Sequence, residues 1–119
     1  MDALSQVAFG QGIYYVVTAL WPFFHMGSFL LVTGPKTDLW LVRTVGALIL
    51  VIGLPLFLTP FYEKPPKEII LLGVAAAVAL ASVDVYYVVR CVISPIYLVD
   101  GAIEIGFLAA WLWAYHVRA

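Results

Sequence analysis

Charge is scarce in this sequence of 119 residues, which has six lysines and arginines against seven aspartates and glutamates and a net charge of −1. Neither sign is concentrated in a tail or patch. The chain therefore lacks the basic footprint of a nucleic-acid-binding protein and the polybasic segment that attracts anionic lipid surfaces. A charged fraction of 11% also argues against a soluble domain, where about 25% is usual. The partners that remain are the lipid bilayer and other membrane helices.

Cysteine and the common short motifs are missing as well. Cys91 is the only cysteine, which excludes an internal disulfide and any metal motif built from several cysteines. A lone cysteine in apolar sequence is more commonly a filler than a reactive thiol. The stretch Gly34-Pro-Lys-Thr37 lacks the second glycine and the spacing of a phosphate-binding loop, so it is interpreted as a turn. Residues 1–6 lack the basic region of a signal peptide, and the first apolar segment is expected to be a retained helix.

Apolar residues are abundant, at 65% of the chain with a mean hydropathy of +1.06. Four segments have the about 20 residues that a helix needs to cross the hydrocarbon core of a bilayer. They cover residues 5–24, 39–58, 68–90 and 95–116. The connections are short, which favours antiparallel neighbours. The sequence predicts an all-α membrane protein, a single domain over residues 1–119 that forms an antiparallel four-transmembrane-helix bundle.

Proline, glycine and aromatic residues mark the expected helix ends. Trp21-Pro22 ends the first span, and residues 23–32 are too short to cross again, so they are expected to form a kinked or interfacial extension of the first helix. Gly34-Pro35 closes this extension. Ser94-Pro95 is expected to open the fourth span, because serine is a good N-cap and proline is tolerated in the first turn. Aromatic residues expected at the far interface are Trp111, Trp113 and Tyr115.

Ionisable residues interrupt the apolar segments in one half of the membrane, and the other half is almost purely aliphatic and aromatic. At 1.5 Å per residue, Arg43 lies roughly 6 Å into the second span and Asp84 roughly 9 Å before Arg90. Asp100 and Glu104 lie roughly 7 and 13 Å into the fourth span from the same side. Such side chains normally face a bundle interior and a partner. The sequence predicts one polar pocket formed by Asp84, Asp100, Glu104, Arg43, Arg90, Tyr87 and Tyr97.

Helical phase supports this pocket. Asp84 falls within about 20° of Gly73, on a face of small residues that lets helices approach closely. Asp100 and Glu104 are four residues apart and project from one face. A second stripe of small residues on the fourth span, suited to helix packing in lipid, comprises Ala102, Gly106, Ala110 and Ala114.

Several interpretations of the pocket are open. In the structural one, Arg43 and Arg90 pair with the three carboxylates, and Tyr87 or Tyr97 satisfies the spare lone pairs. Two arginines leave one carboxylate over, and Glu104, the deepest, is then the best candidate for a group that takes up a proton. A divalent-cation site is chemically possible, but the paired Glu-x-x-His motif is absent and no metal is assigned.

His25 is the one candidate for holding a cofactor. It lies beside Trp21, Phe23 and Phe24, and its imidazole could ligate a haem or a chlorophyll-like pigment. An interfacial histidine bonded to a neighbour is the simpler explanation.

Membrane orientation depends on lysine and arginine counts near the helix ends. One side holds Lys64, Lys67 and Arg118, and the other side holds Lys36, Arg43 and Arg90. If Arg43 belongs to a buried network, the tally is three against two and favours both termini in the cytoplasm.

Two stretches carry a family resemblance, Thr33-Gly-Pro-Lys-Thr-Asp-Leu-Trp-Leu-Val-Arg-Thr-Val-Gly46 and the segment from Asp84-Val-Tyr-Tyr-Val to Tyr97-Leu-Val-Asp100. The chain resembles small bacterial four-helix membrane proteins of unknown function. In size and in its glycine-containing second helix it is similar to the DoxX-like group. The resemblance implies a bacterial inner membrane protein, and it carries over no functional residue and no activity.

The expected function follows from the missing soluble domain and the missing catalytic motifs. The leading expectation is a non-enzymatic accessory or assembly subunit of a larger membrane complex, or a homo-oligomer. One alternative is a protein that binds or transports a small ligand or a proton at Asp84, Asp100 and Glu104. A second alternative is an intramembrane enzyme of unknown reaction with Asp100 and Glu104 as acid and base.

Overall fold

Helices dominate the part of the chain that the structure describes. The computed structural model describes residues 2–61 and 64–117, so Tyr62, Glu63 and Arg118 of the expected connection and charge tally lie outside it. The helices within this part are α1 (Ala3–Phe24), α2 (Met26–Thr33), α3 (Leu39–Leu58), the 3₁₀ turn η1 (Thr59–Phe61), α4 (Lys67–Val89) and α5 (Tyr97–Val117). Four of them, α1, α3 extended by η1, α4 and α5, are long and apolar enough to cross a bilayer. The predicted all-α fold with four spans is confirmed, and the chain is an integral membrane protein.

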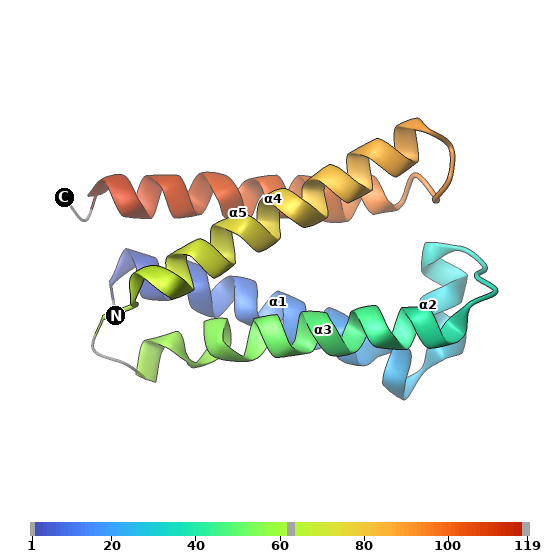
Figure 1. Ribbon diagram of the computed structural model, residues 1–119, viewed down its shortest axis with the longest axis horizontal. Coiled ribbons are helices and arrows are strands. Elements are labelled where there is room, and N and C mark those ends of the chain that lie inside the picture. The colour runs from blue at the N-terminus through green and yellow to red at the C-terminus, as the bar shows by residue number, and fades with distance from the viewer. Residues whose placement is uncertain (1, 62–63, 118–119) are drawn as a thin grey trace.

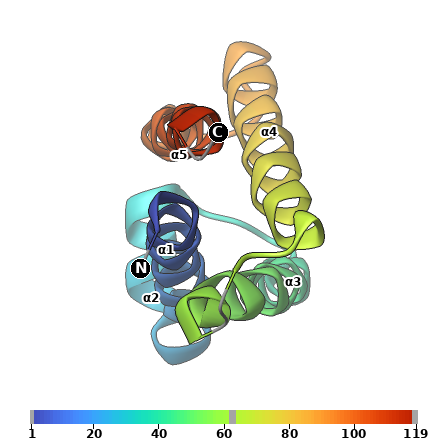
Figure 2. The same cartoon turned by 90° about the vertical axis from the view of Figure 1, so that its left-hand side faces the viewer.

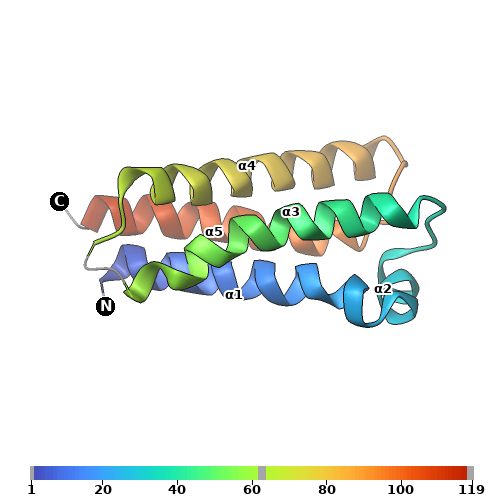
Figure 3. The same cartoon turned by 60° about the horizontal axis from the view of Figure 1, so that its bottom comes forward.

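The long helices form an antiparallel ring in the order α1, α3, α4, α5, as Figure 1 and Figure 2 show. The tightest pairs are α1 with α3 and α4 with α5, so the bundle consists of two hairpins that meet mainly along α1 and α5. The end of α1, the start of α3, the end of α4 and the start of α5 gather beside α2 (Figure 3). We call this the α2 end of the bundle. It corresponds to the half of the membrane in which the sequence places the charges.

The predicted kink separates α1 from α2. Pro22 lies in the last turn of α1, and His25 leaves the helical conformation with φ −153° and ψ 79°. The Nδ1 atom of His25 accepts a hydrogen bond of 3.0 Å from the backbone N–H of Ser28, which caps α2. Gly34 ends α2 with φ at 99°, a conformation that glycine adopts without steric cost. The eight residues of α2 are too few to cross a membrane, as expected.

Two helix starts differ from the expected ones by two residues, and α4 begins at Lys67, one residue before the predicted start. The fourth span begins at Tyr97, two residues later than predicted, because the Tyr97 N–H donates to the Ser94 carbonyl at 3.1 Å and closes a tight turn before the helix. The first span begins at Ala3, two residues earlier than predicted. There Asp2 is the N-cap, and its Oδ1 accepts from the Ser5 N–H at 2.8 Å.

Glycines set the close approaches in the bundle. A Cβ at Gly12 of α1 would lie 2.3 Å from the backbone nitrogen of Phe57 on α3, and a Cβ at Gly53 would lie 2.9 Å from the Tyr15 Cβ. On α4, a Cβ at Gly73 would lie 2.5 Å from the Trp111 ring of α5. The absence of a side chain at these positions lets the helices pack at these distances.

The inward face of α5 is not the expected stripe of small residues. Ala114 is buried, but Ala102 and Gly106 are exposed, and a Cβ at Gly106 would meet open space. The buried positions include Glu104 and Trp111 instead. Trp111 is fully buried, so its expected place at the far interface is wrong, because its indole N–H bonds inside the bundle.

Candidate functional site

Three acidic residues of α4 and α5 meet inside the bundle near the α2 end. Asp84 is 5% exposed and Glu104 is 1% exposed, while Asp100 is half-buried. Asp100 lies one helical turn before Glu104 on α5 and directly before Gly101, which packs against Asp84. Asp84 fits against α5 because Gly101 has no side chain; a Cβ there would lie 3.4 Å from the Asp84 Cβ. The structure thus brings together the three acids that the sequence assigned to one pocket.

Two consecutive tyrosines of α1 bind two of these acids, Asp100 and Glu104. The Tyr14 hydroxyl donates to Asp100 Oδ1 at 2.5 Å, and the Tyr15 hydroxyl donates to Glu104 Oε1 at 2.6 Å. Phe107 packs against both tyrosine rings, with centroids 5.7 and 6.5 Å away. A tyrosine hydroxyl can donate to a carboxylate and can accept from a carboxylic acid. These contacts therefore suit a carboxyl group that changes its protonation state.

Gln11 of α1 carries the polar network deeper into the bundle. Its Nε2 donates to the Tyr15 hydroxyl at 3.0 Å and to the Gly73 carbonyl at 2.9 Å, and its Oε1 accepts from the Trp111 indole N–H at 2.6 Å. Along α5, the network from Asp100 to Trp111 covers about 16 Å, or half of a hydrocarbon core of about 30 Å. Polar contacts therefore extend from the carboxyl groups toward the half of the membrane that is almost purely aliphatic and aromatic in sequence.

Two carboxyl oxygens in the site have no partner. Asp84 Oδ2 and Glu104 Oε2 are buried, and neither forms a hydrogen bond with the residues in 2–61 and 64–117. An unpaired carboxylate in such surroundings costs several kcal/mol. The site consequently offers places where protons, or a small cationic group, would be stabilised.

The predicted arginine partners lie elsewhere. Arg43 and Arg90 are exposed, and in the described part of the chain no ion pair connects either of them to Asp84, Asp100 or Glu104. The expected buried ion-pair network is wrong for these residues. Arg43 lies on an outward face of α3, where a long side chain can reach the interface rather than pay for burial. With Arg43 back in the charge tally, the two sides hold three basic residues each and the rule gives no orientation.

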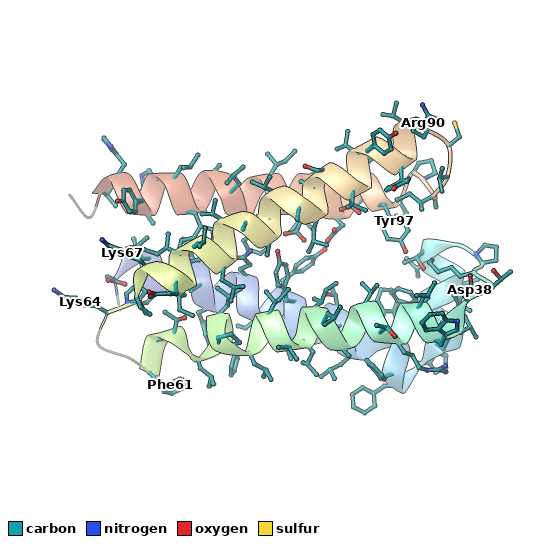
Figure 4. All side chains as sticks on the ribbon, viewed as in Figure 1. Asp38, Phe61, Lys64, Lys67, Arg90 and Tyr97 are labelled. Carbon is teal, nitrogen blue, oxygen red and sulfur yellow. The ribbon has the colours of Figure 1, made fainter. Side chains whose placement is uncertain are left out.

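Tyr87 and Tyr97 also lie outside the cluster. Tyr87 is 41% exposed and packs edge-on against Tyr86, with ring centroids 5.0 Å apart. Tyr97 points from the start of α5 toward α2 (Figure 4), and the ammonium group of Lys36 lies 5.3 Å from its ring centroid. These two tyrosines contact other residues at the surface of the α2 end, and within the described residues they form no hydrogen bond with the carboxyl groups.

His25 caps α2 and shares no hydrogen bond with the three acids in the part of the chain described. One ring nitrogen is therefore engaged in the cap, and a haem or a chlorophyll-like pigment at the other nitrogen stays a prediction. Within residues 2–61 and 64–117, no three His, Cys, Asp or Glu side chains are arranged to hold a metal ion.

Sequence reasoning did not assign Tyr14, Tyr15, Gln11 and Trp111 to the site. One available signal was the spacing of Gln11 and Tyr15, which are four residues apart and share a helix face. A second signal was on the fourth span, where Trp111 falls within about 20° of Asp100 at 100° per residue. No family model, curated protein or solved structure matches the chain, so the DoxX-like resemblance stays a prediction.

Proposed function

We propose that this membrane protein takes up and releases protons at Asp84, Asp100 and Glu104 while it binds or carries a small ligand from the α2 end. The observation that carries the proposal is the pair of buried carboxyl oxygens without a partner, on Asp84 and Glu104, in a cluster that also contains Asp100. Three adjacent anions with no arginine among them would repel one another at low dielectric. Protons, or a cationic ligand that replaces them, relieve this repulsion.

The contacts around the cluster support exchange rather than a purely structural role. Tyr14 and Tyr15 hold one oxygen each of Asp100 and Glu104 and leave the second oxygen of Glu104 without a partner. Gln11 closes the inner end, because its amide is engaged by three groups and cannot readily pass on a proton. Protons are therefore expected to enter and leave from the α2 end.

Infrared spectroscopy of the protein in lipid nanodiscs tests this proposal. On acidification from about pH 9 to about pH 6, a range above the one in which exposed carboxyl groups take up protons, the carboxylic-acid C=O band of the wild type should grow. Asp100→Asn and Glu104→Gln should each remove part of that change, and Glu68→Gln should leave it intact. Glu68→Gln is the matched control, because Glu68 is exposed in the first turn of α4. If neither cluster variant differs from the Glu68 control, the three acids do not exchange protons and the proposal is wrong.

A second candidate is the assembly subunit or homo-oligomer that the sequence favours. The observation in its support is the outward face of α5, where Ala102 and Gly106 are exposed at a spacing of four residues. This spacing allows a second membrane helix to approach closely. In mild detergent, Gly106→Leu should then abolish self-association, or the co-purification of a partner membrane protein. An unchanged particle mass would count against this surface.

A bacterial inner membrane belongs to the same proposal and rests on the resemblance to small bacterial four-helix proteins. Sidedness can be measured with the native thiol, because Cys91 is the sole cysteine and is exposed at the α2 end. A membrane-impermeant maleimide should label Cys91 in intact spheroplasts only if the α2 end, and with it the carboxyl site, faces outward. Labelling only after lysis would place the site on the cytoplasmic side.

A further inference from the structure

A groove on the outer surface of α4 lies apart from the carboxyl site. It has a volume of about 640 Å³, and its walls are mainly the apolar side chains Ala81, Val85 and Val89 of α4 and Ile105 of α5. Ser82 also lines it, but the Ser82 hydroxyl donates to a backbone carbonyl of its own helix at 2.7 Å. The groove therefore presents a surface that suits hydrocarbon.

The length of the groove matches one leaflet of a bilayer. It begins at Arg90, the C-cap residue of α4, and reaches Ala81 nine residues earlier. At 1.5 Å per residue this is about 13 Å, close to half of a hydrocarbon core of about 30 Å. A hydrocarbon chain that enters beside Arg90 would lie against α4 to about the middle of the membrane.

A cation stands at the mouth of this groove. The Arg90 guanidinium lies 5.8 Å from the ring centroid of Tyr86, which also lines the groove. Arg90 is exposed, and no acidic side chain in the described residues pairs with it. Figure 4 shows it at the α2 end, on the side of α4 away from α1 and α3. The guanidinium is thus held by an aromatic face with its donors available to an anion.

We propose that this groove binds an anionic phospholipid, with one acyl chain along α4 and the headgroup phosphate on Arg90. Arginine binds phosphate through paired, charge-assisted hydrogen bonds, and the guanidinium lies at the headgroup level where a helix end meets the interface. The apolar wall below it, one leaflet deep, accommodates the chain. The site does not depend on proton exchange at the acids, because none of them lines the groove.

Native mass spectrometry of the detergent-purified protein tests the headgroup contact with phosphatidylglycerol and phosphatidylcholine as probes. The wild type should bind phosphatidylglycerol more tightly, and Arg90→Gln should reduce this affinity about tenfold, the effect of losing roughly 1.4 kcal/mol. Arg43→Gln is the matched control, because Arg43 is also an exposed arginine of the same membrane half but lies outside the groove. An equal loss in both variants, or no preference in the wild type, would overturn the proposal.

A second variant tests the acyl-chain contact. Ala81→Phe fills the deep end of the groove and leaves Arg90 in place, so the affinity of this variant for phosphatidylglycerol should fall. In the wild type, inorganic phosphate should not compete with phosphatidylglycerol for the site. Competition by inorganic phosphate alone would reveal a headgroup site without a chain, contrary to the proposal. A change of oligomeric state in Ala81→Phe with unchanged lipid binding would show that a second copy covers the groove and would equally overturn it.

Discussion

Gly73→Ala should destabilise the bundle, because the new methyl group would strike the residue that closes the polar network. The Cβ would lie 2.5 Å from Trp111 Cζ2 and 2.6 Å from Trp111 Nε1. Trp111 is fully buried and cannot swing aside. Overpacking of this kind costs about 1–3 kcal/mol. Displacement of the indole also breaks its 2.6 Å hydrogen bond to Gln11 and leaves a buried acceptor unpaired, which adds about 1–3 kcal/mol.

The matched control is Gly10→Ala on α1, where an added Cβ meets no atom within 4 Å. This variant should be neutral, or more stable by up to about 1 kcal/mol through helix propensity. The assay is unfolding in mixed micelles by titration with sodium dodecyl sulfate, followed by circular dichroism. In a Trp111→Phe background the Gly73→Ala penalty should shrink, because the clashing indole atoms are gone. Equal stability of Gly73→Ala and Gly10→Ala would refute the reasoning.

Two further predictions use the same unfolding assay, and a third uses amide hydrogen exchange. Gly12→Ala should lower the free energy of unfolding by about 1–3 kcal/mol, because its Cβ would lie 2.3 Å from a backbone nitrogen of α3. Gly10→Ala, where the Cβ meets no atom within 4 Å, should not lower it. A similar loss in both variants would contradict the close contact at Gly12. Tyr15→Phe should cost about 1–3 kcal/mol by removing the 2.6 Å hydrogen bond to Glu104, and a neutral result would show that this bond is not formed in lipid. The backbone hydrogen bond from Ser5 lowers the pKa of Asp2, so the cap stabilises α1 above the ordinary carboxyl range and is lost as the pH falls through the lowered pKa. The protection of the first-turn amides of α1 against hydrogen exchange, relative to their intrinsic exchange rate at each pH, should therefore fall on acidification in the wild type but not in Asp2→Asn, which caps without ionising.

The placement of helices could be predicted from local signals. Apolar runs of membrane-spanning length gave the four spans, and Pro22 with the short segment after it gave the break before α2. The starts at Ala3 and Tyr97 were missed by two residues each, because caps and tight turns depend on backbone hydrogen bonds that residue types only favour.

The site was predicted in part. Asp84, Asp100 and Glu104 could be grouped because depth along a helix and helical phase are properties of spacing alone. Their partners could not be chosen this way, because distance from the helix end gives an arginine's depth in the membrane but not the direction in which its side chain points. Arg43 lies at the expected depth but on an outward face of α3. Rotation of a helix about its axis decides such a choice, and it is set by packing against its neighbours.

By itself, therefore, the sequence determined that this chain crosses the membrane four times and that three acids share one half of it, because both follow from apolar length and residue spacing. Only the tertiary structure decided that tyrosines rather than arginines meet those acids. The physical reason is close packing: Gly12 and Gly53 bring α1 against α3, Gly73 admits Trp111, and Tyr15 is thereby turned onto Glu104. The acids are left without a cation in the described part of the bundle, and this makes the site a candidate for proton exchange.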